Sequence, residues 1–231
     1  MIIGFLVMWV GRIRHARMIL LLNDGVPVMN EEKQETKFSQ TLGGHFSTAL
    51  GKLNLASNLY YQMGKHVSGK EIRGLNFLME VSLKNDISGG FEHLSGTSYN
   101  ETSKIKSFTP FYGTNHKFNG FMDYFYVGNH MGSVGLNDIY LKYKYTKNKF
   151  GFNADLHYFG AAADISANAD NYLGTELDLS ISWVVKPTAK LVAGWSMLLA
   201  GDSMEILKGG DSSVRQSWGY IMLSVTPSFI K

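Results

Sequence analysis

The sequence predicts an all-β fold, an antiparallel up-and-down transmembrane β-barrel, here an incomplete barrel of about 11–12 strands. Three observations predict it: apolar and polar residues alternate along most of the chain, short turns alternate with longer loops, and the composition favours strands. The chain has 25 Gly, 14 Phe and 12 Tyr but only 4 Pro, a mixture typical of strands and tight turns. Its 231 residues are expected to form a single β-barrel domain, residues 1–231, because all-β domains often reach about 200–250 residues.

Alternation with a period of two is cleanest in four segments, each with one apolar and one polar face. They are KLNLASNLYY at 52–61, LNFLMEVSLK at 75–84, FGFNADLHYF at 150–159 and GTELDLSISW at 174–183. Less regular alternation predicts further strands. These are 12–22, 37–50, 87–94, 119–127, 136–145, 190–200 and 216–229, together with the segment before Gly11.

The expected connections alternate in length along the chain. Short turns are predicted at 23–25, 50–52, 84–86, 147–149 and 186–188, and longer polar loops at 64–70, 95–115, 160–171 and 201–215. Short turns on one side and long loops on the other describe a meander of hairpins.

The residue types on the two faces favour a membrane barrel over a soluble one. Polar positions carry Asn, Ser, Asp, Glu, Gly and His, and aromatic residues such as Tyr61, Tyr158 and Trp183 close the apolar faces at strand ends. An apolar outer band with aromatic girdles around a polar interior is what a lipid-embedded barrel needs. A soluble β-barrel binding protein is the alternative, and it would hold four test residues in its interior: Leu55, Phe77, Leu156 and Leu179.

Composition and charge exclude several other functions. The absence of cysteine excludes disulfides, zinc–thiolate sites and iron–sulfur ligation. With 22 basic and 19 acidic residues spread along the chain, there is no concentrated cationic face for nucleic acid. Residues 1–17 place an apolar run before the arginines, the reverse of a secretory signal. We therefore expect a strand there, in a chain whose amino-terminal strands and signal peptide are missing.

The stretch FTPFYGTNHKFNGFMDYF at 108–125 raises the question of catalysis. Outer-membrane phospholipases place a histidine two residues before a nucleophilic serine, and the segment from His116 to Gly120 has that outline. The nucleophile position holds Phe118, which cannot attack an ester, so the Ser-His mechanism fails. The sequence thus predicts no enzyme, with a barrel enzyme acting on lipid as the alternative. His116 and Asp123 become loop or lumen candidates.

Other clusters of ionisable residues have two readings each. Asp155, His157 and Asp164 could hold calcium in a loop, but such residues more often cap turns, and the seven histidines are scattered. Glu176 and Asp178 share a strand face about 7 Å apart, a spacing that suits general acid/base work or a hydrated wall balanced by lysines. No metal and no cofactor are predicted.

Six pieces of sequence, in order along the chain, carry a family resemblance. They are FYGTNHKFNGFMDYFYVG, GLNDIYLKYKY, ADLHYFGAAAD, LGTELDLSISW, LVAGWSMLLAGDSM and SWGYIMLSVTPSF. Together they resemble the carboxy-terminal part of the alginate-export-like outer-membrane β-barrels, with the Bacteroidetes-type porins closest, over Thr36 to Lys231. The resemblance implies a pore whose lumen presents an electropositive constriction, with acidic residues beside it, to a polyuronate.

The predicted function is that of an outer-membrane porin-like channel for passive passage or export of a hydrophilic solute, an alginate-like acidic polysaccharide being one candidate. Expected partners are outer-membrane lipid, the solute or polysaccharide and the barrel-assembly machinery, without nucleic acid, and the expected location is the bacterial outer membrane. The candidate lumen or loop residues are His116, Asp123, Lys142, Lys144, Asp155, His157, Glu176 and Asp178.

Overall fold

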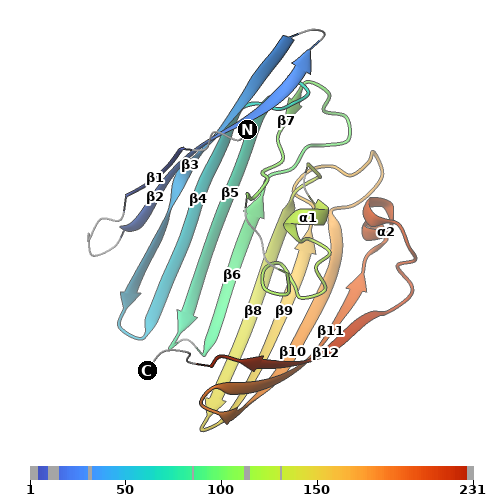
Figure 1. Ribbon diagram of the computed structural model, residues 1–231. Helices are drawn as coiled ribbons and strands as arrows, with labels where there is room; N and C mark the ends of the chain where they lie inside the picture. Colours follow the sequence, from blue (N-terminus) through green and yellow to red (C-terminus); the bar gives the residue numbers. More distant parts are fainter. Residues whose placement is uncertain are drawn as a thin grey trace.

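The computed structural model describes residues 5–9, 16–30, 33–84, 86–111, 115–130 and 132–227. These residues form one antiparallel sheet in which successive strands are neighbours, curved but not closed (Figure 1). Strands account for 62% of the structure and helices for 5%, which confirms the predicted all-β, up-and-down class. The open, curved sheet is consistent with an incomplete barrel.

The main path of the sheet follows the order of the chain, with one short strand off it. Its strands are β1 (Phe5–Trp9), β2 (Ala16–Asn30), β3 (Lys33–Leu50), β4 (Leu53–Lys65), β5 (Glu71–Leu83), β6 (Ile87–Leu94), β8 (Leu136–Lys147), β9 (Phe150–Gly160), β10 (Tyr172–Lys186), β11 (Ala189–Ala200) and β12 (Gln216–Val225). Strand β7 (Lys104–Ile105) pairs in parallel with the start of β5. Two short helices, α1 (Val127–His130) and α2 (Asp202–Lys208), lie in long connections. Within the described ranges, neither helix has the length and apolar character that a membrane crossing requires.

The cleanly alternating segments form strands as predicted. They lie in β4, β5, β9 and β10, and the predicted strand 87–94 matches β6 at both ends. The predicted strand 12–22 is described only from residue 16 onward, and the near-terminal aromatic Phe229 lies outside the described residues. From β3 onward, the tight turns lie at one end of the strands and the longer connections at the other (Figure 1).

Two local predictions were wrong. The expected turn at 23–25 lies inside β2, where Asn23 and Gly25 pair with Gln40 and Phe38 of β3. Gly25 is absent from the positive-φ residues that a tight turn would use, and β3 offers partners along the whole of this segment, so pairing overrides turn chemistry. The expected strand 119–127 is instead a looped segment that leads into α1.

The convex face of the sheet is apolar across neighbouring strands. The register places Leu141 opposite Leu156 and Leu156 opposite Leu177, all on the same face, and Leu141 is 54% exposed. Of the four residues that a soluble barrel would enclose, Leu156 is exposed, and Leu55, Phe77 and Leu179 are half-buried. The register assigns all four to this convex face. A soluble barrel would place all four on the concave, inner face instead.

The buried core lies on the opposite, concave face, near the ends of the strands that connect to the long loops. There Leu136, Phe159 and Leu173 from neighbouring strands are fully buried. Phe125, from the connection between β6 and β8, packs on Phe159 with the ring centroids 4.5 Å apart. Met204 of α2 joins the same cluster. The core is therefore formed by strands and by loops that fold back over them.

Gly43 of β3 is expected to be required for the close pairing of β3 with β4. A Cβ at residue 43 would overlap the backbone of Leu59 and Tyr60, so Gly43→Ala should lower the free energy of unfolding by about 1–3 kcal/mol. Gly89 of β6 is the matched control, because a Cβ there would make only an ordinary contact with Tyr140. Urea unfolding followed by tryptophan fluorescence measures both variants. Equal stability of G43A and G89A would contradict this account of the β3–β4 contact.

Candidate functional site

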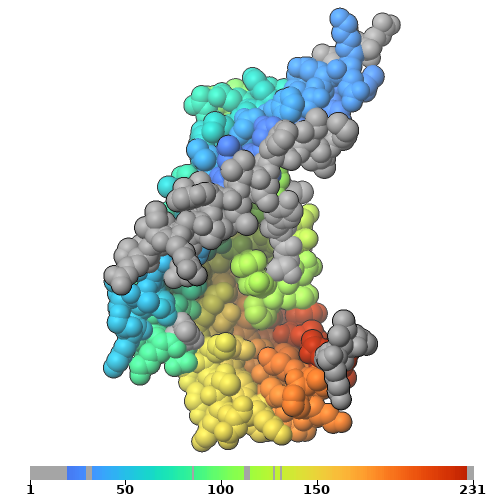
Figure 2. Space-filling model, turned by 60° about the vertical axis from the view of Figure 1, so that its left-hand side comes forward, coloured from blue at the N-terminus to red at the C-terminus, as the bar shows by residue number. Residues whose placement is uncertain are grey.

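The connection between β6 and β8 folds back over the concave face of the sheet. We call residues 107–126 of this connection the inward loop, of which 107–111 and 115–126 are described. The loop and α1 lie in front of the inner face of β8 and its neighbours (Figure 1). Figure 2 shows the same segment, in yellow-green, between the amino-terminal and carboxy-terminal halves of the sheet. The inward loop contains the stretch at 108–125, for which the sequence raised the question of catalysis.

His116 and Asp123 close a tight turn within the inward loop. The backbone N–H of His116 donates to Asp123 Oδ1 at 2.8 Å, and His116 Nδ1 lies 3.0 Å from Asp123 Oδ2 and 2.8 Å from the carbonyl oxygen of Phe121. The imidazole also stacks on Trp218 of β12 with ring centroids 4.4 Å apart. This pair therefore shapes the loop and holds it against the last strand.

The inward loop is seated on a row of carboxylates that we call the acidic wall. The wall consists of Glu92 of β6, Asp138 of β8, and Glu176 and Asp178 of β10. All four lie on the concave face, and the last three are at most 2% exposed. Carboxylates this far from water need hydrogen-bond donors or counter-charges. The loop supplies several of these donors.

Asn119 joins two of the carboxylates through its side-chain amide. Its Nδ2 donates to Glu92 Oε2 at 2.9 Å and to Asp138 Oδ2 at 3.2 Å. The second oxygen of Glu92 accepts from Asn76 Nδ2 at 3.0 Å. One asparagine therefore fixes the loop to both β6 and β8.

Backbone donors bind the other two carboxylates. The N–H of Met122 donates to Glu176 Oε1 at 2.8 Å, and the N–H of Phe121 donates to Asp178 Oδ2 at 3.3 Å. Gly120 allows this approach, because it has a φ of 85° and a Cβ at this position would overlap the Glu176 carboxylate. The positive φ values here explain why the predicted strand 119–127 does not form.

His157 forms a buried pair beneath the loop that sequence reasoning did not find. Its Nδ1 lies 2.9 Å from Asp138 Oδ1, and both side chains are 1% exposed. The Nε2 atom of His157 is buried and has no hydrogen-bond partner. A His–Asp pair orients a general base in many hydrolases. In this structure the pair joins β8 to β9.

The remaining predicted candidates lie elsewhere on the concave face. Lys142 Nζ lies 3.7 Å from Asp155 Oδ2 and 4.7 Å from the ring centroid of Tyr140. Lys144 is exposed near the tight turn that follows β5, where its backbone N–H donates to the carbonyl oxygen of Asp86. The structure thus brings four of the eight candidates to the inward loop: His116, Asp123, Glu176 and Asp178.

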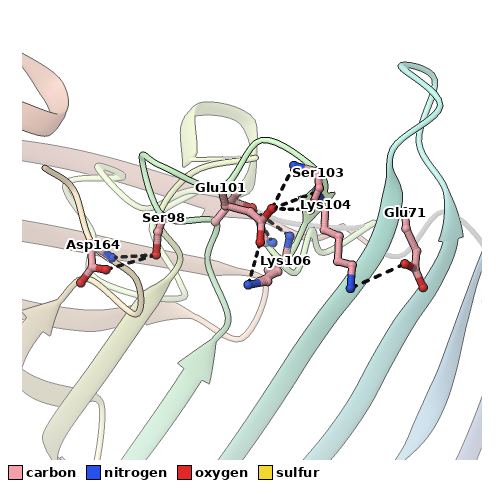
Figure 3. A network of polar contacts seen from close by, with 9 residues as sticks. Glu71, Ser98, Glu101, Ser103, Lys104, Lys106 and Asp164 are labelled. Carbon is pink, nitrogen blue, oxygen red and sulfur yellow. Dashed lines mark hydrogen bonds and ion pairs between the residues drawn. The ribbon is translucent and has the colours of Figure 1, made fainter.

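A second polar network orders the loop just before the inward loop (Figure 3). Glu101 Oε1 accepts from the backbone N–H groups of Ser103 and Lys104 at 2.9 and 3.2 Å, and Glu101 Oε2 lies 2.8 Å from Lys106 Nζ. The hydrogen bond from Lys106, followed by those from Ser103, lowers the pKa of Glu101 to about 2. Lys104 Nζ lies 3.9 Å from Glu71 Oε2 of β5.

Asp164, considered for calcium from the sequence, contacts this same loop. Its Oδ2 accepts from Ser98 Oγ at 3.4 Å (Figure 3). Across the described part of the chain, no group of three or more His, Cys, Asp or Glu side chains is placed to hold a metal ion. Asp164 therefore connects the loop that follows β9 to the loop that follows β6, at the same end of the strands.

Asn119→Ala is expected to release the inward loop. Without the amide, Glu92 and Asp138 each lose a donor in a buried position, which costs about 1–3 kcal/mol per unsatisfied group. Hydrogen exchange of the backbone amides at 115–126 should accelerate by about ten- to hundredfold. Asn153→Ala is the control, because Asn153 bonds Ser180 on the same face without touching the loop. Similar protection of the loop in both variants would contradict the anchoring role of Asn119.

Comparison with known proteins adds no relative, since no family model matches the chain and no curated protein matches it significantly, and the alginate-export resemblance stays a prediction.

Proposed function

We propose that this chain forms the wall of an outer-membrane β-barrel channel for a hydrophilic solute. The observation that carries the proposal is the difference between the two faces of the sheet. The convex face presents exposed leucines such as Leu59 and Leu141, whereas the concave face carries buried carboxylates, amides and hydroxyls. A continuous apolar surface of this extent needs an apolar environment, and lipid around a polar lumen supplies it.

Aromatic residues near the ends of the convex strands support the membrane location. Phe150 and Trp183 stack near the tight turns, with centroids 6.2 Å apart and rings inclined by 7°. At the other end of β9, Tyr158 packs against Tyr172 at 5.0 Å. Phe150 and Tyr158 are about 26 Å apart along the strand. A strand tilt of ~40° shortens this to roughly 20 Å, near the ~25 Å apolar band of barrels.

The proposed mechanism is diffusion through a hydrated lumen that the inward loop narrows. Selectivity would come from width and from charged side chains. Most ionisable groups beneath the loop are carboxylates, and the nearest lysine on the wall, Lys142, is paired with Asp155. Because Lys142 is paired, it is not free to bind a polyanion, and this favours a neutral solute. Passage of an alginate-like polysaccharide therefore stays a prediction for the conductance experiment below.

The alternative of an enzyme acting on lipid finds little support in the described residues. A Ser–His contact does exist, with His66 Nδ1 2.9 Å from Ser68 Oγ. It lies in the exposed turn between β4 and β5, where the same Nδ1 accepts from the backbone N–H of Ser68. This is the geometry of a turn, and no carboxylate is described in contact with His66.

Leu141→Arg is expected to impair insertion into bilayers. Leu141 lies mid-strand on the convex face, where an arginine at the bilayer midplane costs about 2–4 kcal/mol. Ser182→Arg is the matched control, because the register places Ser182 on the concave face opposite Gly151. Insertion is measured as the fraction of folded protein that floats with phosphatidylcholine vesicles. If the fraction of S182R that floats with the vesicles is as low as that of L141R, the assignment of the lipid face is wrong.

Conductance in planar bilayers tests the channel itself. An open channel predicts stepwise conductance of the inserted protein, and the sign of the reversal potential in a salt gradient measures its preference between K⁺ and Cl⁻. Oligouronate added to one side should leave the current nearly unchanged. Absence of any conductance from inserted protein would overturn the channel proposal. Block by oligouronate at micromolar concentration would instead support the acidic polysaccharide as solute.

A further inference from the structure

A cavity of about 380 Å³ lies between the inward loop and the concave face of the amino-terminal half of the sheet. This volume falls in the range of ~300–1,000 Å³ typical of small-molecule sites. Its floor is provided by β2 to β6 and its cover by the inward loop and α1. The lining residues that matter for the chemistry are Thr41, Asn58, Tyr60, Phe108, Phe118 and His130.

The lining combines aromatic surfaces with a few polar groups. Tyr60, Phe108 and Phe118 present rings to the cavity, and Asn58 contributes a side-chain amide. Thr41 is 3% exposed and its Oγ1 has no hydrogen-bond partner. An unpaired buried hydroxyl is costly, so a ligand that supplies a partner for it is favoured. A purely apolar ligand would leave this hydroxyl unpaired.

The charge of the cavity opposes an anionic ligand. Its described lining includes no lysine or arginine. His130 is neutral at pH 7, because burial lowers its pKa to about 4, and its Nδ1 has no partner. Glu92 of the acidic wall also lines the cavity, and its oxygens already accept from Asn76 and Asn119. A carboxylate on the ligand would meet no lysine or arginine among these lining residues, and the Lys117 ammonium lies over the Phe118 ring, 5.0 Å from its centroid.

We propose that this cavity binds one ring of a neutral carbohydrate. A pyranose has apolar C–H faces that pack on aromatic rings and hydroxyls at its edge that exchange hydrogen bonds with groups such as Thr41 Oγ1 and the Asn58 amide. Such a ring fits a lining of aromatic side chains with a small number of polar groups. The inference rests on the proposed channel function and narrows its solute to an uncharged saccharide.

The test uses the full chain in detergent micelles and isothermal titration calorimetry. The probes are maltohexaose, mannohexaose and xylohexaose as neutral saccharides and hexamannuronate as the charged one. At least one neutral probe should bind, and at least tenfold more tightly than hexamannuronate. Phe118→Ala should raise its dissociation constant about tenfold, the factor that corresponds to ~1.4 kcal/mol. Thr41→Val should raise the dissociation constant of the neutral probe severalfold, while the thermal stability of the protein stays unchanged or increases.

Two control variants distinguish the cavity from general effects of substitution. Tyr99→Ala removes an exposed aromatic side chain from the connection between β6 and β7. Thr146→Val removes a hydroxyl near the tight turn that follows β8. Neither residue lines the cavity. Both should bind the neutral probe as the parent does. Three outcomes would each overturn the inference. Hexamannuronate could bind as tightly as the neutral probes or more tightly, or none of the neutral probes could bind. Alternatively, Y99A and F118A could lose equal affinity for the neutral probe.

The conductance experiment keeps this inference separate from the channel proposal. Conductance without saccharide binding would leave the channel standing and remove the carbohydrate site. Saccharide binding that is weakened in F118A, in protein that never conducts, would remove the channel and leave the binding site. A neutral saccharide that also lowers the current in the parent but not in F118A supports both.

Discussion

The constraint on which the rest of the structure depends is the shared phase of alternation across neighbouring strands. Side chains alternate with a period of two, so a slip of one residue would move every side chain of a strand to the other face. Leu141, Leu156 and Leu177 stand in register on one face, and this places Asp138, His157 and Glu176 on the other. The acidic wall is thus a consequence of the same pairing that makes the convex face apolar.

Buried carboxyl groups need hydrogen-bond partners, and the inward loop supplies part of them, since Glu176 Oε2 and Asp178 Oδ1 have none. Ionised groups away from water are tolerated only when donors or counter-charges reach them. The loop provides donors from Asn119 and from the backbone of Phe121 and Met122. Its own conformation depends on residues that accept positive φ, including Asn119 and Gly120. Wall and loop therefore stabilise each other, and neither has an adequate set of partners alone.

Much of the sheet could be predicted from sequence because alternation is a local signal. The segment 87–94 was predicted to the residue, and Glu176 and Asp178 were expected on one face, where the structure places them. The turn expected at 23–25 failed because pairing with β3 is a long-range effect that local turn chemistry does not contain. The donors to Glu176 and Asp178 lie 54 and 57 residues away in sequence, and no periodicity encodes such a contact.

The proposed solute site exists only where the inward loop covers the sheet. One side of the cavity is the sheet and the other is the inward loop, and Asn119 belongs both to the cavity lining and to the anchor on Glu92. A ligand that binds only when the loop is in place adds its binding free energy to that state. By reciprocity, whatever loosens the loop weakens the ligand by the same factor. In the proposed channel, retention of the solute would therefore depend on the same contacts that hold the inward loop on the acidic wall.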